Sequence, residues 1–481
     1  MSNWRLLSGV AAASMMAVAI VAPAEAQLTT SGVRGSVTAP DGSPVSGATI
    51  VLIDTRTNFT REVVSSASGA FTARGMNVGG PYRVEVSADG QQNFALEGVF
   101  ISLGEVTDID LRFPAAEADR TLDTIVVTGS ADSIMQTAIG PSSTFTLEDL
   151  QNSPAINRDL KDIVRIDPRV FLDLANEDGI QCGGASPRFN SLTVDGVGLN
   201  DGFGLNDNGY PTQRSSFPFD AIQNVSVELA PFDVNYGTFT ACNINAVTKS
   251  GTNEFTGSLF FDYTDDTLQG DTLSGEKIDR PKFTARRRGG SIGGPIIEDK
   301  LFFFGSYEKF DGFDIFDRGP IGSGAGREVE DFTQADFDRI RQIAIDVYDY
   351  DPGGVPGAEP TSDEKYLLRL DWNISNNHRA TATYLYNESI SLQESDGDDD
   401  EFEYFNHLYG RGAELKAYSA AVYSDWTPNL STEFRYSLNE VDFTQASIAG
   451  TDFGEVQVEV GGSTIYLGAD DSRHSNDLNY N

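Results

Sequence analysis

"KYLLRLDWNISNNHRATATYLYN", residues 365–387, alternates apolar and polar side chains on both sides of a short polar turn. The apolar members stand two residues apart: Tyr366, Leu368, Leu370 and Trp372 before the turn, and Ala380, Ala382, Tyr384 and Tyr386 after it. Successive side chains of a β-strand point to opposite faces of the sheet. The stretch therefore predicts an antiparallel hairpin with one apolar face and one polar face.

A second hairpin repeats the pattern between residues 418 and 439. Strands of about nine residues, joined by short turns on one side and long acidic segments on the other, are typical of a transmembrane β-barrel. Trp372 and Trp426 each end the first strand of a hairpin, where an aromatic girdle would meet the membrane interface. Because alternation alone does not distinguish lipid from a protein core, a large soluble antiparallel sandwich is the alternative.

The barrel pattern is incomplete within this chain. About eight candidate strands of ~10 residues follow residue 254, whereas the plugged barrels of outer-membrane transporters have about 22 strands. The final residues, "DDSRHSNDLNYN", are polar. An open sheet edge cannot face lipid, since each unpaired backbone group there costs several kcal/mol. We therefore expect residues 254–481 to form the first part of an outer-membrane barrel whose other strands lie beyond residue 481.

Composition excludes one class of partner, and the N-terminus indicates export. The 481 residues include 34 basic and 72 acidic ones, a net charge of −38 that argues against nucleic-acid binding. Residues 1–26 have the pattern of a signal peptide: a charged start, the apolar run "LLSGVAAASMMAVAIVAP" and the small-residue site "AEA". A buried N-terminal helix is the alternative. The two cysteines, Cys182 and Cys242, would then meet an oxidising compartment in which they can pair.

Three further segments precede the barrel region. Residues 27–113 contain short strand-like runs separated by Gly/Pro turns such as "PDGSP", which predict a small β-sandwich. Residues 114–136 form a linker that contains "LDTIVVTGS", a run of β-branched residues between polar flanks. Residues 137–253 predict an α+β domain, with Thr146 as a helix N-cap and apolar residues at helical spacing at 160, 163 and 164.

The order of these parts resembles a TonB-dependent outer-membrane receptor of the Oar-like group. "GSVTAPDGSPVSGATIVL" resembles the carboxypeptidase regulatory-like domain, and "DTIVVTG" resembles the TonB box, the family's energy-coupling segment. "SLTVDGVGLND" and "IQNVSVELAPFDVNYGTFTACNINAVTKSGTNEFTGSLFFDY" resemble blocks of the plug domain and the first barrel strand. The expected fold is mainly β: an N-terminal β-sandwich, an α+β plug domain and an incomplete antiparallel transmembrane β-barrel.

The resemblance implies specific site residues. The TonB-binding strand would consist of Asp123, Thr124, Ile125, Val126, Val127 and Thr128, and it would pair with TonB by adding one strand to a sheet edge. The alternative is that this stretch pairs within the sandwich or the plug. Both cysteines fall in the plug, where we expect a disulfide between Cys182 and Cys242, with two free buried thiols as the alternative.

The implied function is energised uptake of an unidentified extracellular ligand. The ligands imported by the family include peptides, glycans and metal chelates. The implied partners are TonB with its inner-membrane energising complex, outer-membrane lipid and, for glycan uptake, a surface lipoprotein. The sequence predicts no catalytic, cofactor or metal site, since its three histidines occur in no HExxH arrangement. The acidic run 396–401 predicts a solvated loop, with a calcium site as the alternative. An adhesion or matrix barrel without active transport is the alternative function.

Overall fold

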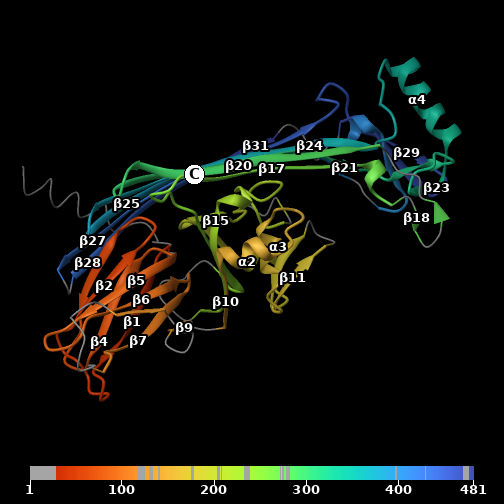
Figure 1. Ribbon diagram of the computed structural model, residues 1–481. Helices are drawn as coiled ribbons and strands as arrows, with labels where there is room; N and C mark the ends of the chain where they lie inside the picture. The colour runs from red at the N-terminus through yellow and green to blue at the C-terminus, as the bar shows by residue number, and fades with distance from the viewer. Residues whose placement is uncertain are drawn as a thin grey trace, which may run out of the picture.

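The computed structural model describes residues 29–115, 125–128, 134–138, 141–174, 178–202, 206, 208–231, 239–270, 272–273, 276–277, 282–395, 398–427, 430–469 and 476–480. Figure 1 shows a mainly β fold, in which a small sandwich (red and orange) and a mixed region (yellow) lie on one side of a long sheet (green to blue). The signal peptide predicted for residues 1–26 lies outside the described residues. Within the described part, no helix has the length and apolar character needed to span a membrane.

The N-terminal part is a sandwich of two sheets, as the sequence predicted. One sheet has the strand order β4-β1-β7-β9 and the other β3-β2-β5-β6-β8. Inward-facing side chains such as Ile50 and Leu52 alternate with more exposed ones and fill a single core. The strands are β1 (Ser31–Thr38), β2 (Thr49–Asp54), β3 (Thr60–Val64), β4 (Ala70–Met76), β5 (Gly79–Ser87), β6 (Phe94–Ile101), β7 (Glu105–Arg112), β8 (Ile125–Thr128) and β9 (Ile134–Ala138).

The middle part combines a five-stranded sheet, in the order β10-β15-β16-β13-β14, with two short helices. Thr146 caps the first helix, and its side chain and that of Asp149 form a capping box. All five residues of the second helix are buried. The elements are β10 (Ser142–Phe145), α2 (Leu147–Asn152), α3 (Leu160–Val164), β11 (Val170–Asp173), β12 (Gly179–Cys182), η3 (Pro187–Phe189), β13 (Ser191–Val194), β14 (Val197–Gly198), η4 (Phe219–Ala221), β15 (Ile222–Leu229) and β16 (Cys242–Thr248). We call this part, residues 141–250, the plug.

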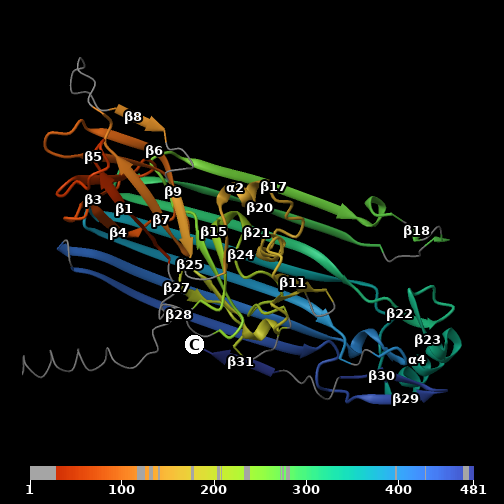
Figure 2. The same cartoon turned by 90° about the horizontal axis from the view of Figure 1, so that it is seen from below.

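The third part is a long antiparallel sheet of eight strands, which agrees with the number expected from the sequence. Figure 2 shows these strands running side by side. They are β17 (Thr256–Asp265), β20 (Thr284–Ile297), β21 (Leu301–Ile315), β24 (Ala358–Ser375), β25 (His378–Gln393), β27 (Tyr409–Thr427), β28 (Leu430–Ser447) and β31 (Asn476–Tyr480). The predicted hairpin is β24–β25, which turns between Ser375 and His378. Its strands have 18 and 16 residues, longer than the nine-residue runs because pairing continues into the polar segments.

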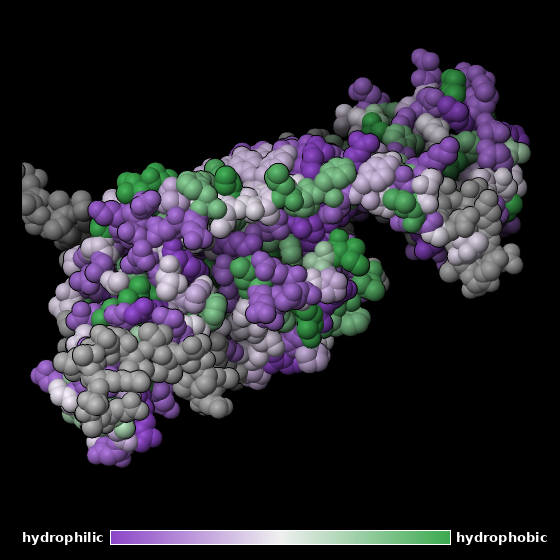
Figure 3. All heavy atoms as spheres, in the orientation of Figure 1, coloured by the Kyte–Doolittle hydropathy of each residue, from purple (hydrophilic) through white to green (hydrophobic). Residues whose placement is uncertain are grey.

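The long sheet has its apolar side chains on the exposed face and its polar side chains on the covered face. In a soluble protein the arrangement is the reverse. On the outer face of β24, the side chains of Leu368, Leu370 and Trp372 are about half exposed. On the inner face, Lys365 and Asp371 are buried. Figure 3 shows several apolar patches (green) along the outside of this sheet, with polar residues between them. An apolar exterior over a polar interior is the pattern of a transmembrane barrel, here present as an open fragment.

At the far end of the long sheet, three connecting segments fold together into a loop module, residues 316–357, 398–408 and 448–469. Its core includes Phe332 and Phe337 from the first segment, Phe402 and Tyr404 from the second, and Ile465 from the third. Strand alternation did not predict this module. Its elements are β22 (Arg318–Ile321), β23 (Arg327–Thr333), α4 (Gln334–Tyr348), β26 (Glu401–Glu403), η6 (Phe405–His407), β29 (Val456–Val460) and β30 (Ser463–Leu467); β18 (Thr272–Leu273) and β19 (Glu276–Lys277) form a separate hairpin, and η5 (Asp266–Leu268) follows β17.

Candidate functional site: the plug against the barrel wall

The plug packs directly on the inner face of the long sheet. One hydrophobic cluster contains plug residues such as Ile163 and Val194 together with sheet residues such as Leu367, Leu385 and Phe443. Polar contacts extend this interface: the backbone N–H of Gln213 donates to Ser389 Oγ at 3.0 Å, and Asn439 Nδ2 donates to the carbonyl of Gly198 at 2.9 Å. The apolar part of this contact resists separation, and the polar part fixes the orientation of the plug.

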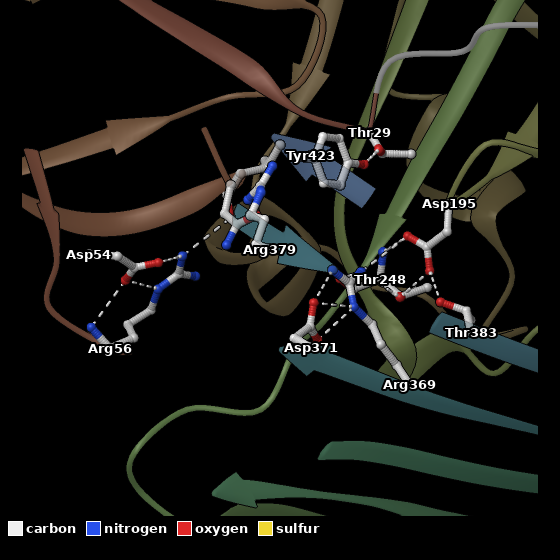
Figure 4. Close-up of polar contacts among 12 residues, drawn as sticks. Thr29, Asp54, Arg56, Asp195, Thr248, Arg369, Asp371, Arg379, Thr383 and Tyr423 are labelled. Atoms are coloured by element: carbon white, nitrogen blue, oxygen red, sulfur yellow. Dashed lines mark hydrogen bonds and ion pairs between the residues drawn. The ribbon is translucent and has the colours of Figure 1, made fainter. Parts of the chain in front are cut away.

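Arg369 is the centre of the buried charges between plug and barrel. It lies on the inner face of β24, and its guanidinium donates to Asp371 at 2.8 Å and to the carbonyl of Thr248 at 3.0 Å. A third partner, Asp195, lies 3.3 Å away in the plug. Figure 4 shows Arg369 between the two carboxylates, with Thr248 and Thr383 around Asp195. The guanidinium thus joins a barrel strand to the turn β13–β14 and to the end of β16.

Local structure explains why Asp195 reaches this position. Asp195 and Gly196 form the two-residue turn of the hairpin β13–β14, both with positive φ (49° and 79°). Asp-Gly is a preferred pair in such turns, because both positions need a left-handed backbone. The Asp195 side chain accepts hydrogen bonds from the backbone N–H and the hydroxyl of Thr248, at 3.0 and 2.5 Å. The turn therefore holds its carboxylate beside the barrel wall.

A second charged cluster lies between the plug and strands β20, β21 and β24, and a cavity of about 190 Å³ separates them in part. The buried carboxylate of Glu308 has Arg158 of the plug at 3.5 Å and Lys365 at 3.9 Å. Lys365 also lies 3.1 Å from Asp363 and donates to the carbonyl of Ser215 at 2.9 Å. This cluster and the Arg369 cluster each join plug and barrel through charges that water does not screen well.

The start of the plug is held by a third charged contact. Arg169 donates to both carboxylate oxygens of Asp167, at 2.8 and 2.5 Å, and its Nη2 also donates to Ser143 Oγ at 2.9 Å. Burial alone would raise the pKa of Asp167, but hydrogen bonds from Arg169 and Ser143 outweigh burial and hold that pKa below its usual value. Strand β10, the first strand of the plug, is thereby fastened to the loop after α3.

The predicted TonB-binding strand is only partly within the described residues. Asp123 and Thr124 lie outside them, whereas residues 125–128 form β8. Strand β8 pairs in parallel with β6, so that Phe94 faces Ile125 and Glu97 faces Thr128. This pairing corresponds to the alternative that the stretch pairs within the sandwich. Binding of TonB by residues 123–128 stays a prediction.

Cys182 and Cys242 are buried in the plug, and a disulfide joins them with a Cα–Cα distance of 5.9 Å. The bond connects the end of β12 to the start of β16. It closes a covalent loop with a sequence separation of 60 residues. The loop contains the Asp195 turn, so the element that contacts Arg369 lies within the cross-linked part of the plug.

Trp372 and Trp426 lie near the ends of β24 and β27 with about half or more of each side chain exposed. Trp426 Nε1 donates to Thr432 Oγ1 at 2.9 Å, and its ring contacts the ring of His378. Their role in a membrane-interface girdle stays a prediction. Within the described ranges, no group of three or more metal-ligating side chains comes together.

Sequence reasoning missed Arg369, Asp195 and Glu308. One signal was present: a charged side chain in the middle of a long alternating strand, on the face opposite the apolar one, needs a buried partner. Arg369 satisfies that description in the quoted stretch. The identity of the partner was not readable, because Asp195 precedes it by 174 residues.

The sequence matches three domain families in succession: the carboxypeptidase regulatory-like domain over residues 32–114, the TonB-dependent receptor plug domain over residues 135–241 and an outer membrane beta barrel domain over residues 247–313. The TonB-dependent transporter Oar of Myxococcus xanthus is 33% identical over 137 residues, which cover 27% of this chain and 12% of that protein.

Among solved structures, the outer membrane transporter YddB of Escherichia coli is 12% identical, with a TM-score of 0.47. The siderophore receptor PirA of Acinetobacter baumannii is 17% identical, with a TM-score of 0.45. Each alignment covers 70% of this chain and 43% of the other chain. The matched part is therefore less than half of each of these relatives.

Proposed function

This chain is a TonB-dependent receptor with a carboxypeptidase regulatory-like domain, a plug domain and part of an outer-membrane β-barrel, and on that premise we propose that it imports a ligand with energy supplied through TonB. The observation that carries the proposal is the buried contact of plug and barrel, centred on Arg369, inside a sheet whose outer face is apolar. The plug obstructs passage until a pull on the chain before it loosens this contact.

We also propose an orientation of these parts relative to the membrane. The sandwich and residues 123–128 lie on the periplasmic side, where TonB can reach them, and the loop module faces the outside. TonB adds a strand to residues 125–128, and each backbone hydrogen bond contributes about 0.5–1.5 kcal/mol net. A few such bonds hold while force is applied and release afterwards. The cargo is a peptide, a glycan or a metal chelate; for a glycan, a surface lipoprotein would assist.

The test is binding of the purified C-terminal domain of TonB to a peptide of residues 120–132, beside the same peptide with Val126→Pro. Proline removes a backbone donor and fixes φ, so it should abolish strand addition. We expect binding to the first peptide only, measured by calorimetry. A control with Val126→Thr keeps a β-branched residue and should retain binding. If neither peptide binds, residues 123–128 are not the TonB-binding strand, and the adhesion function becomes the better account.

A further inference from the structure

The sandwich is attached to the barrel at the ends of three successive hairpins. Asn58 Nδ2 donates to Asp299 Oδ1 at 2.8 Å, in the turn between β20 and β21. Arg61 forms an ion pair with Asp425 near the end of β27. Asn77 accepts a hydrogen bond from Arg379, at the start of β25. The three contacts come from the β2–β3 connection, from β3 and from the β4–β5 connection, and we call them together the docking surface.

The same sandwich is also attached to the plug. Val78 and Leu103 of the sandwich form a small buried cluster with Val247 of the plug. The hydroxyl of Thr144 donates to the carbonyl of Leu103 at 3.2 Å. The sandwich therefore bridges two parts that must separate when the plug moves.

The contact with the hairpins is less well packed than the contact of plug and barrel. A cavity of about 600 Å³ lies between the sandwich and the hairpin ends, lined by Arg61, Arg379 and Asp425 among others. Its contacts are hydrogen bonds and ion pairs, whereas the plug shares a hydrophobic cluster with the sheet. Polar, incompletely packed contacts within a chain resemble transient interfaces and separate at lower cost.

The two strands that follow residue 115, β8 and β9, pair with the edges of the two sandwich sheets. β8 extends one sheet through β6, and β9 extends the other in antiparallel pairing with β7, from Glu105↔Ala138 to Ile109↔Ile134. A pull on residues 125–128 therefore loads the sandwich before it reaches β10 of the plug. The pulling force reaches the sandwich in two ways: through the pairing of β8 and β9 with its sheets, and through the chain that connects it to β8.

We propose that the sandwich is a latch: docked on the hairpin ends and on the plug, it must leave the barrel before TonB can draw the plug away. This inference rests on the proposed function, because it takes TonB as the source of force. It assigns a mechanical role to the carboxypeptidase regulatory-like domain. Undocking of the polar contact comes first, and loosening of the Arg369 cluster comes second.

The length of the linker between the sandwich and β8 sets a distance at which the latch can be tested. The 11 residues 114–124 connect Phe113 of the sandwich to β8. Eleven residues span at most about 40 Å when fully extended. While the sandwich stays on the barrel, residues 125–128 can thus move no farther than about 40 Å from it. A pull that travels beyond this distance requires the sandwich to undock as long as it stays folded.

The experiment is single-molecule pulling on the full-length receptor in a lipid bilayer, with the C-terminal domain of TonB on the bead. Asn58→Cys with Asp299→Cys, joined by a short thiol-reactive cross-linker, locks the sandwich to the barrel at the Asn58–Asp299 contact, and the two single-cysteine variants treated with the same reagent are matched controls. We expect the receptor without the lock and both controls to extend beyond about 40 Å before TonB detaches. The locked receptor should stop at about that distance. A receptor without the lock that also stops there, or a locked receptor that extends as far, would overturn the latch.

A second variant tests the docking surface without a cross-link. Arg61→Glu places like charges opposite Asp425 and should lower the force of the first extension step, and adding Asp425→Arg should restore it. An unchanged force in Arg61→Glu would contradict the docking surface. The two proposals fail differently: if TonB forms no tether, or tethers a receptor carrying Val126→Pro equally well, the proposed function fails and the latch with it. Normal tethers without a 40 Å limit in the locked receptor overturn the latch alone.

Discussion

Arg369 has only about a tenth of its side chain exposed and has carboxylates on two sides, Asp371 in its own strand and Asp195 in the plug. Desolvating a guanidinium is costly, so its partners determine whether it stabilises the interface or weakens it. Here one partner belongs to the wall and the other to the plug. Arg369 therefore has both of its carboxylate partners only while the plug is in place.

Replacing Arg369 by Met should loosen the plug. The change leaves Asp371 and Asp195 buried without their cation, a loss that typically costs about 3–5 kcal/mol. We expect hydrogen exchange at the amides of Asp195 and Thr248 to become at least about 100-fold faster, measured by mass spectrometry on the full receptor. Arg341→Met is the control, because its ion pair with Asp351 is exposed and such pairs contribute about 0–1 kcal/mol. Equal exchange in both variants would contradict the role of Arg369.

Asp167 gives the plug a defined acid response. Its pKa is lower in the folded plug than in the unfolded chain, so its contribution to stability is fully present at pH values well above the unfolded pKa of about 4 and disappears as the pH falls through the folded pKa. The stability difference between the native plug and Asp167→Asn should therefore shrink between pH 5 and pH 3. Chemical denaturation at each pH measures it. If the stability difference stays constant between pH 5 and pH 3, the contact between Arg169 and Asp167 does not stabilise the plug through the charge of Asp167.

At the scale of elements, β24 presents three distinct zones along its outer face. Trp372 stands at one end, and Glu364 at the other forms an ion pair with Lys309 at 2.9 Å. Trp372 lies eight positions after Glu364, about 26 Å along the strand, which a tilt near 40° reduces to about 20 Å. This length is close to the apolar band of an outer-membrane barrel, ~25 Å. Leu368 lies midway.

A lysine at position 368 should therefore destabilise the inserted barrel. The cost of Lys at the middle of the bilayer is about 2–4 kcal/mol, and it falls to about 0–1 kcal/mol near the interface. We expect Leu368→Lys to lower the urea midpoint of the full receptor in lipid vesicles, and Ser375→Lys, beyond Trp372, to leave it nearly unchanged. If both lysines cost the same, the zones of β24 do not correspond to membrane depth.

The sequence predicted those elements whose signal is local. Alternation identified β24 and β25, Thr146 marked the start of α2, and turn residues outlined the sandwich. What it did not predict depends on distant partners. The parallel pairing of β8 with β6 competes with other edges that "TIVVT" fits equally well, and the loop module combines residues from three segments. Arg369 and Asp195 were each visible as charged residues, but their contact exists only after the plug enters the sheet.

At the scale of the whole molecule, the disulfide limits how far the plug can be drawn out. Cys182 and Cys242 enclose a sequence separation of 60 residues, a length of about 200 Å when fully extended. In single-molecule pulling through TonB, we expect the maximum extension to increase by about 200 Å in the double variant Cys182→Ser with Cys242→Ser. Each single variant should show the same increase, because either one breaks the bond. An extension that does not change would mean that the enclosed loop never unfolds under load.

The loop module has a consequence for how a finished receptor can be recognised. Phe332 and Ile465 share one core although they are 133 residues apart in sequence, and strands β24 to β28 separate their segments. We therefore expect the core to be complete only when these hairpins are paired in register. The surface it builds is therefore a conformational epitope of correct assembly. In the proposed orientation, an antibody fragment selected against this epitope would bind assembled receptors on intact cells and would not bind chains that had not completed assembly.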